Sequence, residues 1–491
     1  MLNPVKYLYF HARMKPDAFA IQSFNLNLTY GQLLIIIQKF AATFRRSGVK
    51  PGQIVALMIA DPSWHWILTL ALFHEAAVPC SSSKYTLTNE NLGIDWVLSD
   101  RAEFDGGPAG RHLFIDSAWV QKALSGEPLT DPLDYPDEDS VCRLILTSGT
   151  TGASKAVALT VRTLEIRLSL SWFYWATPGR EMNMMPIGTT GGFATALNIL
   201  AAGNVFFAVP RNRSVLDAVN FFKINSLIGS PMQIRSMVQD IQNGKPYEGS
   251  VRILRSAGGA IAPLLLKNIK ENLCEKVMNV YGSTEAGPIG AISESNDHAA
   301  ASIAGFPLPN VRIQIVNQSH EILPQGQEGT IRVRTPGMVH EYYKDPVATS
   351  SFFRDGWFYP GDTGRLTKNG FLALSGRGDE LINRGGIKIN LDSLDLFLND
   401  YHGVQDAATF SFENSDGVQD IAAAIVVAKD FEIKALQGEM LKKHGKARTP
   451  DFFVKVDQIP RNPMGKVLRA KLSEDFSATL YARGSQVSWL N

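Results

Sequence analysis

The chain has 491 residues, of which 45% are hydrophobic and 19% charged. This composition predicts a globular protein of two to four domains, at roughly 150 residues each, and excludes a fibrous or disordered chain. The 48 Lys and Arg residues nearly balance the 47 Asp and Glu residues, for a net charge of +1. A dedicated nucleic-acid binder is therefore excluded, and no nucleic-acid partner is expected.

The cysteines and the apolar runs indicate where the protein works. Cys80, Cys142 and Cys274 stand far apart, which disfavours a zinc site or a disulfide framework and favours a cytoplasmic protein. The longest apolar stretch, residues 66–73, is too short to span a membrane, so no stable membrane insertion is expected.

The first part of the chain alternates predicted helices and strands. Residues 30–49 carry apolar side chains at helical spacing and meet a helix stop at Gly48. Residues 54–59 read as a buried strand and residues 64–77 as a second helix. Further strands are predicted at 143–146, 205–209, 226–228 and 253–254. This order predicts an α/β fold with mostly parallel sheets covered by helices.

The pattern changes at Ile303. Residues 311–316 and 330–334 alternate apolar and polar side chains, which is typical of exposed antiparallel strands. We therefore expect a small, antiparallel, barrel-like subdomain over residues 303–375.

A domain boundary is expected where Ser375 to Glu380 interrupts regular structure. The division gives a large N-terminal domain, residues 1–378, and a small C-terminal α+β domain, residues 379–491.

A loop rich in Gly, Ser and Thr at residues 146–155 follows a buried strand. Its amides and hydroxyls can donate to phosphate oxygens, and Lys155 adds a positive charge. A plain surface loop is the alternative. No Gly-Lys-Ser/Thr ends this loop, which disfavours a P-loop ATPase or kinase.

Four more segments carry polar groups suited to a nucleotide. In residues 279–287, Tyr281 can stack on a base, Thr284 can hold a phosphate and Glu285 can hold Mg²⁺. Asp362, in residues 357–364, can accept ribose hydroxyls. The last two are residues 376–389 and the basic turn at 459–469, which contains Lys466. Each segment alone is equally consistent with an ordinary turn.

In this order, the five segments resemble the acyl-adenylate-forming superfamily of acyl-CoA synthetases, peptide-synthetase adenylation domains and firefly luciferase. Residues 28–33 and 48–56 also resemble the opening of that family, so the resemblance runs through nearly the whole chain. It implies a large N-terminal domain that binds ATP and the acid, and a mobile C-terminal lid.

The resemblance also implies an ATP site. The loop around the β- and γ-phosphates would comprise Thr147, Ser148, Gly149, Thr150, Thr151, Gly152 and Lys155. Gly258, Gly259 and Ala260 would line one face of the adenine, with Tyr281 on the other and Gly282 also among the ATP-binding residues. Asp362 and Arg377 would bind the ribose.

The implied catalytic residues are Thr284 at the α-phosphate, Glu285 on Mg²⁺ and Lys466 from the lid. Negative charge builds on the α-phosphate as the acid attacks, so such groups act by alignment and charge neutralisation. Asp379 matches the family's hinge. Gly385, Gly386 and Lys388 would line the channel for a pantetheine thiol.

The sequence departs from the family pattern near the expected acid pocket. Thr189 stands where many acyl-CoA synthetases have His, and Ala156 replaces the usual Gly after Lys155. Residues 182–203 contain no Asp or Glu, which disfavours an α-amino acid, because its buried ammonium would need a partner. The candidate pocket residues are Thr189, Thr190, Gly192, Phe193, Ser230 and Met232. For Phe193 and Met232, ordinary core is an equal alternative.

The expected reaction is ATP-dependent activation of an aryl or medium-chain acyl acid. The acyl group then passes to coenzyme A or to a carrier protein acting in trans, two acceptors that offer the same thiol. A luciferase-type monooxygenase and an inactive binding protein are the alternatives. Intact Thr284, Glu285, Asp362, Arg377 and Lys466 disfavour the inactive protein.

Overall fold

The computed structural model describes most of the chain. The described ranges are 3–81, 92–101, 111–147, 155–175, 179–209, 213–293, 303–377, 381–384, 387–413, 419–428, 431–462, 465–483 and 489–490. No helix in these ranges combines the length and apolar character that crossing a membrane requires.

The first layer of the fold is a six-stranded sheet of order β6-β5-β3-β4-β7-β8, parallel except for the β7–β8 hairpin. Its strands are β3 (Ile54–Met58), β4 (Val78–Ser81), β5 (Trp96–Ser99), β6 (His112–Phe114), β7 (Val141–Thr147) and β8 (Lys155–Thr160). The helices of this part are α1 (Lys6–Met14), α2 (Tyr30–Ser47), α3 (Pro62–His74), α4 (Ser117–Leu124), α5 (Val161–Trp175) and α6 (Thr190–Ala202). A three-stranded sheet joins β10 (Phe206–Phe207), β1 (Phe19–Gln22) and β2 (Asn27–Thr29).

Local signals determine where these helices begin and end. Thr29 and Gln32 form a capping box at the start of α2, and Gly48 ends it in the left-handed region at φ +97°. The predicted start of the second helix was two residues late and its predicted end three residues late. Asp61 caps α3 and Pro62 occupies its first turn, which starts the helix earlier.

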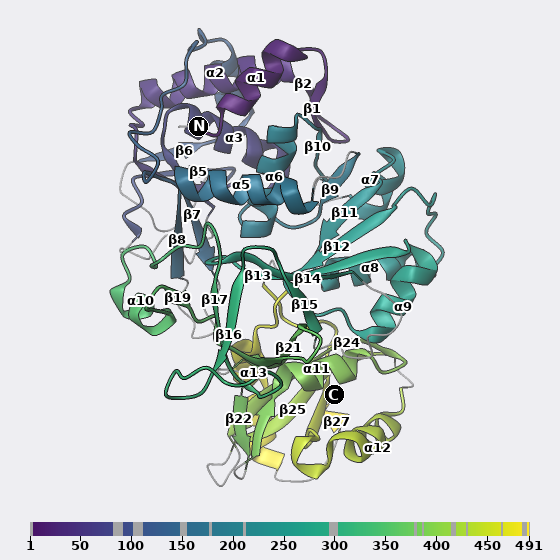
Figure 1. The fold of residues 1–491 in the computed structure, drawn as a ribbon. Helices are drawn as coiled ribbons and strands as arrows, with labels where there is room; N and C mark the ends of the chain where they lie inside the picture. Colours follow the sequence, from purple (N-terminus) through teal and green to yellow (C-terminus); the bar gives the residue numbers. More distant parts are fainter. Residues whose placement is uncertain are drawn as a thin grey trace.

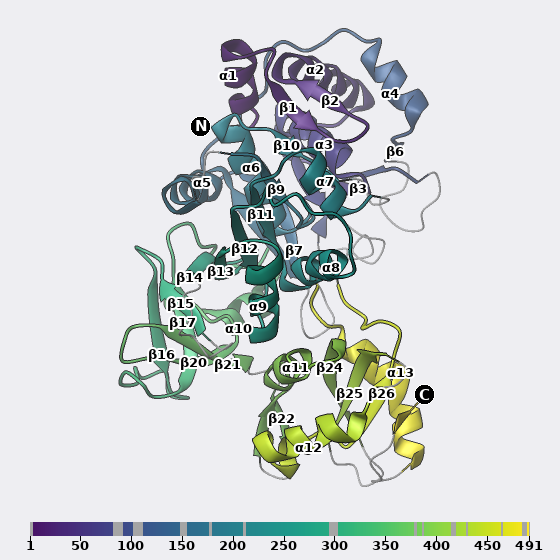
Figure 2. The ribbon, with the colours of Figure 1, turned by 90° about the vertical axis from the view of Figure 1, so that its right-hand side faces the viewer.

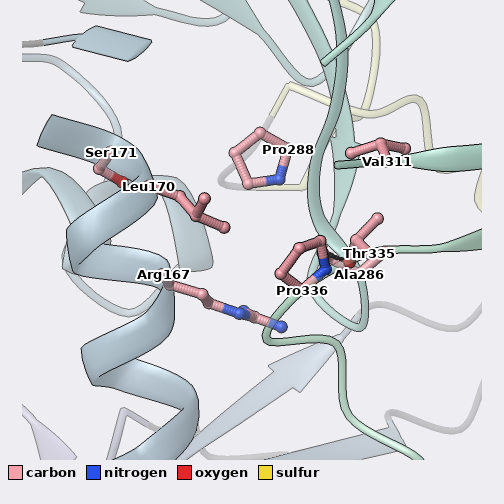
Figure 3. A pocket seen from close by; sticks show the side chains of 8 residues that line it. All are labelled: Arg167, Leu170, Ser171, Ala286, Pro288, Val311, Thr335 and Pro336. Carbon is pink, nitrogen blue, oxygen red and sulfur yellow. Dashed lines mark hydrogen bonds between the residues drawn. The ribbon is translucent and has the colours of Figure 1, made fainter. Parts of the chain in front are cut away.

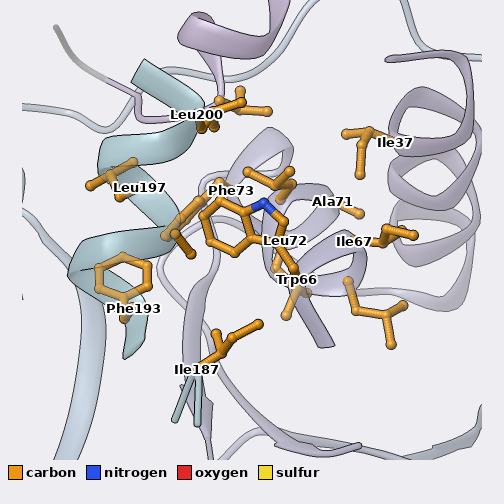
Figure 4. Close-up of a cluster of buried hydrophobic side chains, with 14 of the residues drawn as sticks. Ile37, Trp66, Ile67, Ala71, Leu72, Phe73, Ile187, Phe193, Leu197 and Leu200 are labelled. Carbon is orange, nitrogen blue, oxygen red and sulfur yellow. The ribbon is translucent and has the colours of Figure 1, made fainter. Parts of the chain in front are cut away.

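The core of this part forms around Trp66 of α3. Its indole packs between Ile37 of α2 and Phe193 and Leu197 of α6, as Figure 4 shows. Burial of this aromatic cluster fixes α6, and hence the residues at its N-terminus, against the rest of the domain.

The second layer is a twelve-stranded sheet of order β18-β19-β17-β20-β21-β15-β14-β13-β12-β11-β9, with β16 beside β17. Its parallel part comprises β9 (Glu181–Asn183), β11 (Ser226–Gly229), β12 (Ile253–Ala257) and β13 (Lys276–Ser283). The antiparallel part comprises β14 (Gly287–Ser293), β15 (Ile303–Pro307), β16 (Arg312–Val316), β17 (Gly329–Arg334), β18 (Phe353–Arg354), β19 (Trp357–Phe358), β20 (Asp362–Leu366) and β21 (Leu372–Arg377). Its helices are α7 (Val215–Phe221), α8 (Pro231–Gln242), α9 (Pro263–Asn272) and α10 (Pro346–Phe352).

The strands of segment 303–375 are antiparallel, as their alternating pattern predicts. They continue the large sheet, because β15 pairs with β14. A separate core forms beneath them around Ile331, Val333 and Phe358.

The C-terminal part lies at one end of the molecule, which is the lower end in Figures 1 and 2. Its elements are β22 (Leu381–Arg384), β23 (Ile387–Asn390), α11 (Leu391–Asn399), β24 (Val404–Glu413), β25 (Gln419–Val427), α12 (Ile433–His444), the 3₁₀ turn η4 (Lys446–Arg448), β26 (Phe452–Lys455), α13 (Arg469–Arg483) and β27 (Trp489–Leu490).

The central strand β25 is buried on both faces. Ile421 and Ala423 face one core with α11 and α12, whereas Ala422 and Ala424 face another with α13. The predicted boundary between residues 378 and 379 lies outside the described ranges and stays a prediction.

Candidate active site

The predicted site residues gather at one edge of the large sheet. The parallel strands β9, β11, β12 and β13 end there, and in open α/β sheets this edge is where ligands bind. The segments that follow these strands contain, in chain order, Thr189 and Thr190, Ser230 and Met232, Gly258 to Ala260, and Thr284 with Glu285.

Thr147 and Lys155 flank the predicted phosphate loop as opposite residues of the β7–β8 hairpin. The Thr147 hydroxyl donates to the carbonyl of Lys155 at 3.3 Å. The Lys155 ammonium lies 3.7 Å from the ring centroid of Phe352 and 5.3 Å from that of Tyr342. Of the predicted loop residues, Ser148, Gly149, Thr150, Thr151 and Gly152 lie outside the described residues.

Thr284 and Glu285 form a turn between β13 and β14, and both side chains are held. The hydroxyl of Thr190 donates to that of Thr284 at 2.8 Å. The phenol of Tyr342 donates to Oε1 of Glu285 at 2.6 Å, and Glu285 is only 8% exposed. Thr190, at the start of α6, therefore connects the acid-pocket candidates to the turn that contains Thr284 and Glu285.

The Glu285 carboxylate suits Mg²⁺ that arrives with a nucleotide. Within the described chain, its Oε2 accepts no hydrogen bond, and no cluster of three or more His, Cys, Asp or Glu side chains could form a metal cage. Mg²⁺ in ATP-using enzymes takes one or two carboxylates plus phosphate oxygens and water. The residues present fit that arrangement.

Tyr281 and Asp362 are in direct contact. The Tyr281 phenol donates a hydrogen bond to Oδ2 of Asp362, and the Asp362 side chain is buried. Asp362 pairs with Arg377 across β20 and β21; of Arg377, only the backbone is described. Gly258, in the left-handed region at φ +90°, follows Ala257, which is paired with Val280 beside Tyr281. The predicted adenine and ribose residues therefore share one corner of the sheet.

The acid-pocket candidates divide into those on or beside α6 and those at the start of α8. Thr189, Gly192 and Phe193 belong to the α6 group. Thr189 caps α6, and a side chain at Gly192 would place its Cβ 1.9 Å from the carbonyl oxygen of Pro186, so this position accepts only glycine. Phe193 is 1% exposed and packs against Trp66 and Phe73, which places its ring in the core. Figure 4 shows this ring pointing toward the indole of Trp66.

The turn that carries Lys466 lies against the other two acid-pocket candidates. Gly465 has φ +82°, and a Cβ there would be 3.3 Å from the Met232 Cβ and 3.4 Å from the Ser230 hydroxyl. The amide of Lys466 donates to Oδ1 of Asn462 at 2.9 Å. Ser230 is buried as the cap of α8, whereas Met232 is 37% exposed.

Hydrogen bonds from Arg235 and from the amide of Leu264 help to hold the C-terminal part in this place. Arg235 of α8 donates to Oδ1 of Asn399 at 2.7 Å and to the carbonyl of Gln405 at 3.0 Å. At the start of α9, the amide of Leu264 donates to Oδ1 of Asp400 at 2.5 Å. These contacts, which lie away from Lys466 in the sequence, help to position the turn that carries Lys466 at the edge of the sheet.

The remaining predicted residues lie at the junction between the two parts. Asp379, Gly385 and Gly386 lie outside the described residues. The backbone of Lys388 belongs to β23, and its side chain is not described. The hinge and thiol-channel roles therefore stay predictions.

Two residues that the sequence did not indicate belong to this site. Tyr342 binds Glu285, and Arg167 of α5 donates to the carbonyls of Thr284 and Glu285. Neither residue lies in one of the five motif segments, so no local pattern could have found them.

A model of the family described as AMP-binding enzyme matches residues 87–343, just over half of the chain. The chain belongs to this family. The match confirms the predicted superfamily and the predicted enzyme class.

Relatives of this AMP-binding enzyme are about one quarter identical to it. The fatty acid–[acyl-carrier-protein] ligase MmaC of Mycobacterium marinum is 25% identical, over 94% of this chain and 95% of that protein. The 4-chlorobenzoate–CoA ligase of an Arthrobacter species is 25% identical, over 92% of this chain and 90% of that protein. Gramicidin S synthase 2 of Brevibacillus brevis is 26% identical over 95% of this chain, which spans only 11% of that protein.

Solved structures of similar fold confirm the α/β class of this AMP-binding enzyme. ATP-bound MatB from Rhodopseudomonas palustris has a TM-score of 0.81 at 23% identity, covering 97% of this chain and 99% of that chain. MenE from Bacillus subtilis, in complex with ATP and magnesium ion, has a TM-score of 0.81 at 22% identity, covering 95% and 98% of the two chains.

Proposed function

We propose that this AMP-binding enzyme activates a carboxylic acid with ATP. A carboxylate oxygen attacks the α-phosphorus, the bond to pyrophosphate breaks, and an acyl-adenylate forms. A pantetheine thiol of coenzyme A or of a carrier protein then displaces AMP and gives a thioester. The contact of the Lys466 turn with Ser230 and Met232 is the observation that carries the proposal, because it brings a lysine to the sheet edge that holds Thr284 and Glu285.

The residues at this edge of the sheet would each have a role in binding ATP or in forming the adenylate. Tyr281 and Asp362 bind the nucleoside, while Thr147 and Lys155 anchor the ends of the phosphate loop. Thr284 donates to the α-phosphate, and Lys466 neutralises the charge that develops there. Mg²⁺ held by Glu285 would offset the repulsion between the triphosphate and the incoming carboxylate. Such preorganised groups act mainly by alignment and charge stabilisation.

The acid would be an aryl or medium-chain acyl acid and not an α-amino acid. The stretch from Met182 to Gly203 offers no carboxylate for an ammonium, and a buried cation without a partner is costly. Two relatives are named for a fatty acid and for 4-chlorobenzoate, which supports the same range of acids.

The chain would work as two domains, residues 1–378 and 379–491. Rotation about Asp379 would withdraw Lys466 after the first half-reaction and bring Gly385, Gly386 and Lys388 to the thiol channel. The separate hydrophobic cores within residues 382–480 support independent movement of the C-terminal part.

An acid panel tests the proposal. The purified protein is given ATP, Mg²⁺ and single acids, with coenzyme A or a pantetheinylated carrier protein as acceptor. Pyrophosphate release is expected with aryl or medium-chain acids and not with α-amino acids, and a thioester is expected with one acceptor. Product formation that requires oxygen and no thiol would indicate a luciferase-type reaction, and acid-independent ATP turnover would contradict the proposal.

A further inference from the structure

Arg167 of α5 is a buried cation whose hydrogen bonds, among the described residues, all go to main-chain carbonyls. It donates from Nε to the carbonyl of Gly337 at 2.9 Å, from Nη1 to that of Thr284 at 3.1 Å and from Nη2 to that of Glu285 at 2.9 Å. The side chain is 9% exposed, and no salt bridge to it occurs in the described part of the chain. All three arms of the guanidinium are thus used to join three segments of the fold.

A charge in this position is not explained by stability alone. Burial lowers the pKa of Arg167 to about 10, so the guanidinium remains charged at neutral pH. Buried charges are costly even when they are hydrogen-bonded, and an apolar side chain of similar volume is often as stable. The three charge-assisted bonds offset this cost and fix geometry at the same time.

The carbonyls that Arg167 binds belong to the turn between β13 and β14. The amide of Val339 also donates to the Glu285 carbonyl at 2.9 Å, and the Thr335 hydroxyl donates to the Ala286 carbonyl at 2.5 Å. Gly337, the third acceptor of Arg167, lies between Thr335 and Val339. Arg167 therefore fixes the turn and the segment behind it relative to α5.

The packing between α5 and the turn is interrupted by a small cavity. The cavity lies beside Arg167, lined by Leu170 and Ser171 of α5 and by Ala286, Pro288, Val311, Thr335 and Pro336 across from it. Figure 3 shows Arg167 extending from the helix toward Pro336 and Ala286 along the edge of this cavity. Because a void contributes no contacts to its lining, the hydrogen bonds of Arg167 add a link between α5 and the turn beside this cavity.

We propose that Arg167 is a positioning residue for Mg²⁺-dependent ATP binding. It fixes the main chain of Thr284 and Glu285, while Tyr342 fixes the end of the Glu285 side chain. Glu285 is thus held both at its main chain and at its carboxylate. This role rests on the proposed function of Glu285 as the Mg²⁺ ligand. Residues that orient a metal ligand commonly change metal affinity by about 10–100-fold when they are replaced.

The test measures ATP binding over a Mg²⁺ titration, using the full-length protein and a fluorescent ATP analogue. The variants are Arg167→Met, which removes all three bonds, and Arg167→Lys, which keeps the charge. Arg162→Met is the matched control, because Arg162 lies on the same helix and is half exposed, paired with Glu138 and Asp139. Thermal unfolding of each variant identifies a temperature at which all are folded.

The Mg²⁺ concentration at half-maximal ATP binding is expected to rise about 10-fold or more in Arg167→Met. We expect a smaller rise in Arg167→Lys, because one ammonium cannot reach three carbonyls, and no change in Arg162→Met. A double-mutant cycle of Arg167→Lys with Glu285→Gln should be non-additive, since Arg167 acts through Glu285.

A folded Arg167→Met protein with the wild-type Mg²⁺ midpoint would overturn the positioning role, as would an additive double-mutant cycle. If Arg167→Met does not fold, the Mg²⁺ midpoint of folded Arg167→Lys is used instead, and a wild-type midpoint in that variant would overturn the positioning role. Wild-type protein that binds no ATP at any Mg²⁺ concentration would instead overturn the proposed function, and the positioning role with it. The two failures are therefore distinguishable.

Discussion

The phenol of Tyr281 donates a hydrogen bond to the carboxylate of Asp362, although the two residues are 81 positions apart in the chain. Tyr281 lies on β13 and Asp362 begins β20, and three other strands separate these two in the sheet. The bond joins the residue predicted to stack on adenine to the residue predicted to bind the ribose. We infer that nucleoside recognition is built as one connected unit.

Replacing Tyr281 by Phe keeps the ring for stacking and removes the hydrogen bond to Asp362. We expect the KM for ATP to rise roughly tenfold with a smaller change in kcat, because a hydrogen bond to a charged group contributes about 1.5–3 kcal/mol. The measurement is pyrophosphate release at saturating acid. Tyr401→Phe, at a ring that packs on Phe431 in the C-terminal part, is the control and should match wild type. An unchanged KM in Tyr281→Phe would show that the bond does not orient Asp362 for the nucleotide.

Lys466 is expected to act in adenylate formation. Replacing it with Ala should lower the rate of acid-dependent exchange between pyrophosphate and ATP by about 10²–10³-fold, the usual cost of losing one preorganised donor at a developing charge. Lys471→Ala is the control, because Lys471 is an exposed lysine of α13, five positions along the chain. An exchange rate in Lys466→Ala equal to that of Lys471→Ala would remove Lys466 from the mechanism.

The secondary structure could be predicted where its signals are local. Helix α2 ends one residue before Gly48, and β17 occupies the segment whose side chains alternate, because caps, left-handed glycines and strand periodicity act over a few residues. The start of α3 was placed too late because Asp61 and Pro62, a cap and a first-turn proline, were not used as signals.

The site could be predicted only in part, for the same physical reason. Motifs indicated the segments that are expected to meet the nucleotide, but long-range contacts determine which residues hold these segments in place. Tyr342 is 57 residues from Glu285, and Arg167 is 117 residues from Thr284. The sequence left two positions possible for the Phe193 ring, the acid pocket and the hydrophobic core. The fold decides between them, because Trp66 of α3 packs against this ring. Such pairings depend on tertiary packing, which a single sequence does not encode locally.

Tyr342→Phe removes the donor to the Glu285 carboxylate while keeping the ring near Lys155 and Phe352. We expect kcat/KM for ATP to fall roughly 10–100-fold at limiting Mg²⁺, because a bond to a charged group contributes about 1.5–3 kcal/mol. Excess Mg²⁺ should restore part of the loss.

The matched control is Tyr247→Phe. Its phenol donates to the carbonyl of Leu273, away from the sheet edge that carries the site. Similar losses in both variants, or a loss in Tyr342→Phe that is independent of Mg²⁺, would indicate a general effect on packing rather than an effect on Mg²⁺ binding through Glu285.

His65 should make the stability of the protein sensitive to acid. Its ring is buried in α3, with Nε2 2.8 Å from the Ser81 hydroxyl and Nδ1 3.3 Å from the carbonyl oxygen of Ile59. Burial, and then the charge of Arg143, lower the pKa of His65 to about 3. The folded protein therefore keeps this ring neutral across the range in which an unfolded chain, with a histidine pKa of about 6.5, takes up a proton.

The sign of the effect follows from proton binding. Below a pH of about 6.5 the unfolded state binds a proton that the folded state does not, so the free energy of unfolding falls by about 1.4 kcal/mol per pH unit until the pH approaches the folded-state pKa. His65→Gln cannot titrate. Its stability, measured by urea unfolding with tryptophan fluorescence, should therefore drop by about 1.4 kcal/mol less than that of wild type between pH 7.5 and 5.5. Replacing the exposed His402 by Gln should leave the wild-type dependence unchanged. If wild type and His65→Gln lose equal stability over this interval, His65 takes up its proton over the same pH range in the folded and unfolded states, and the conclusion that the buried ring stays neutral is wrong.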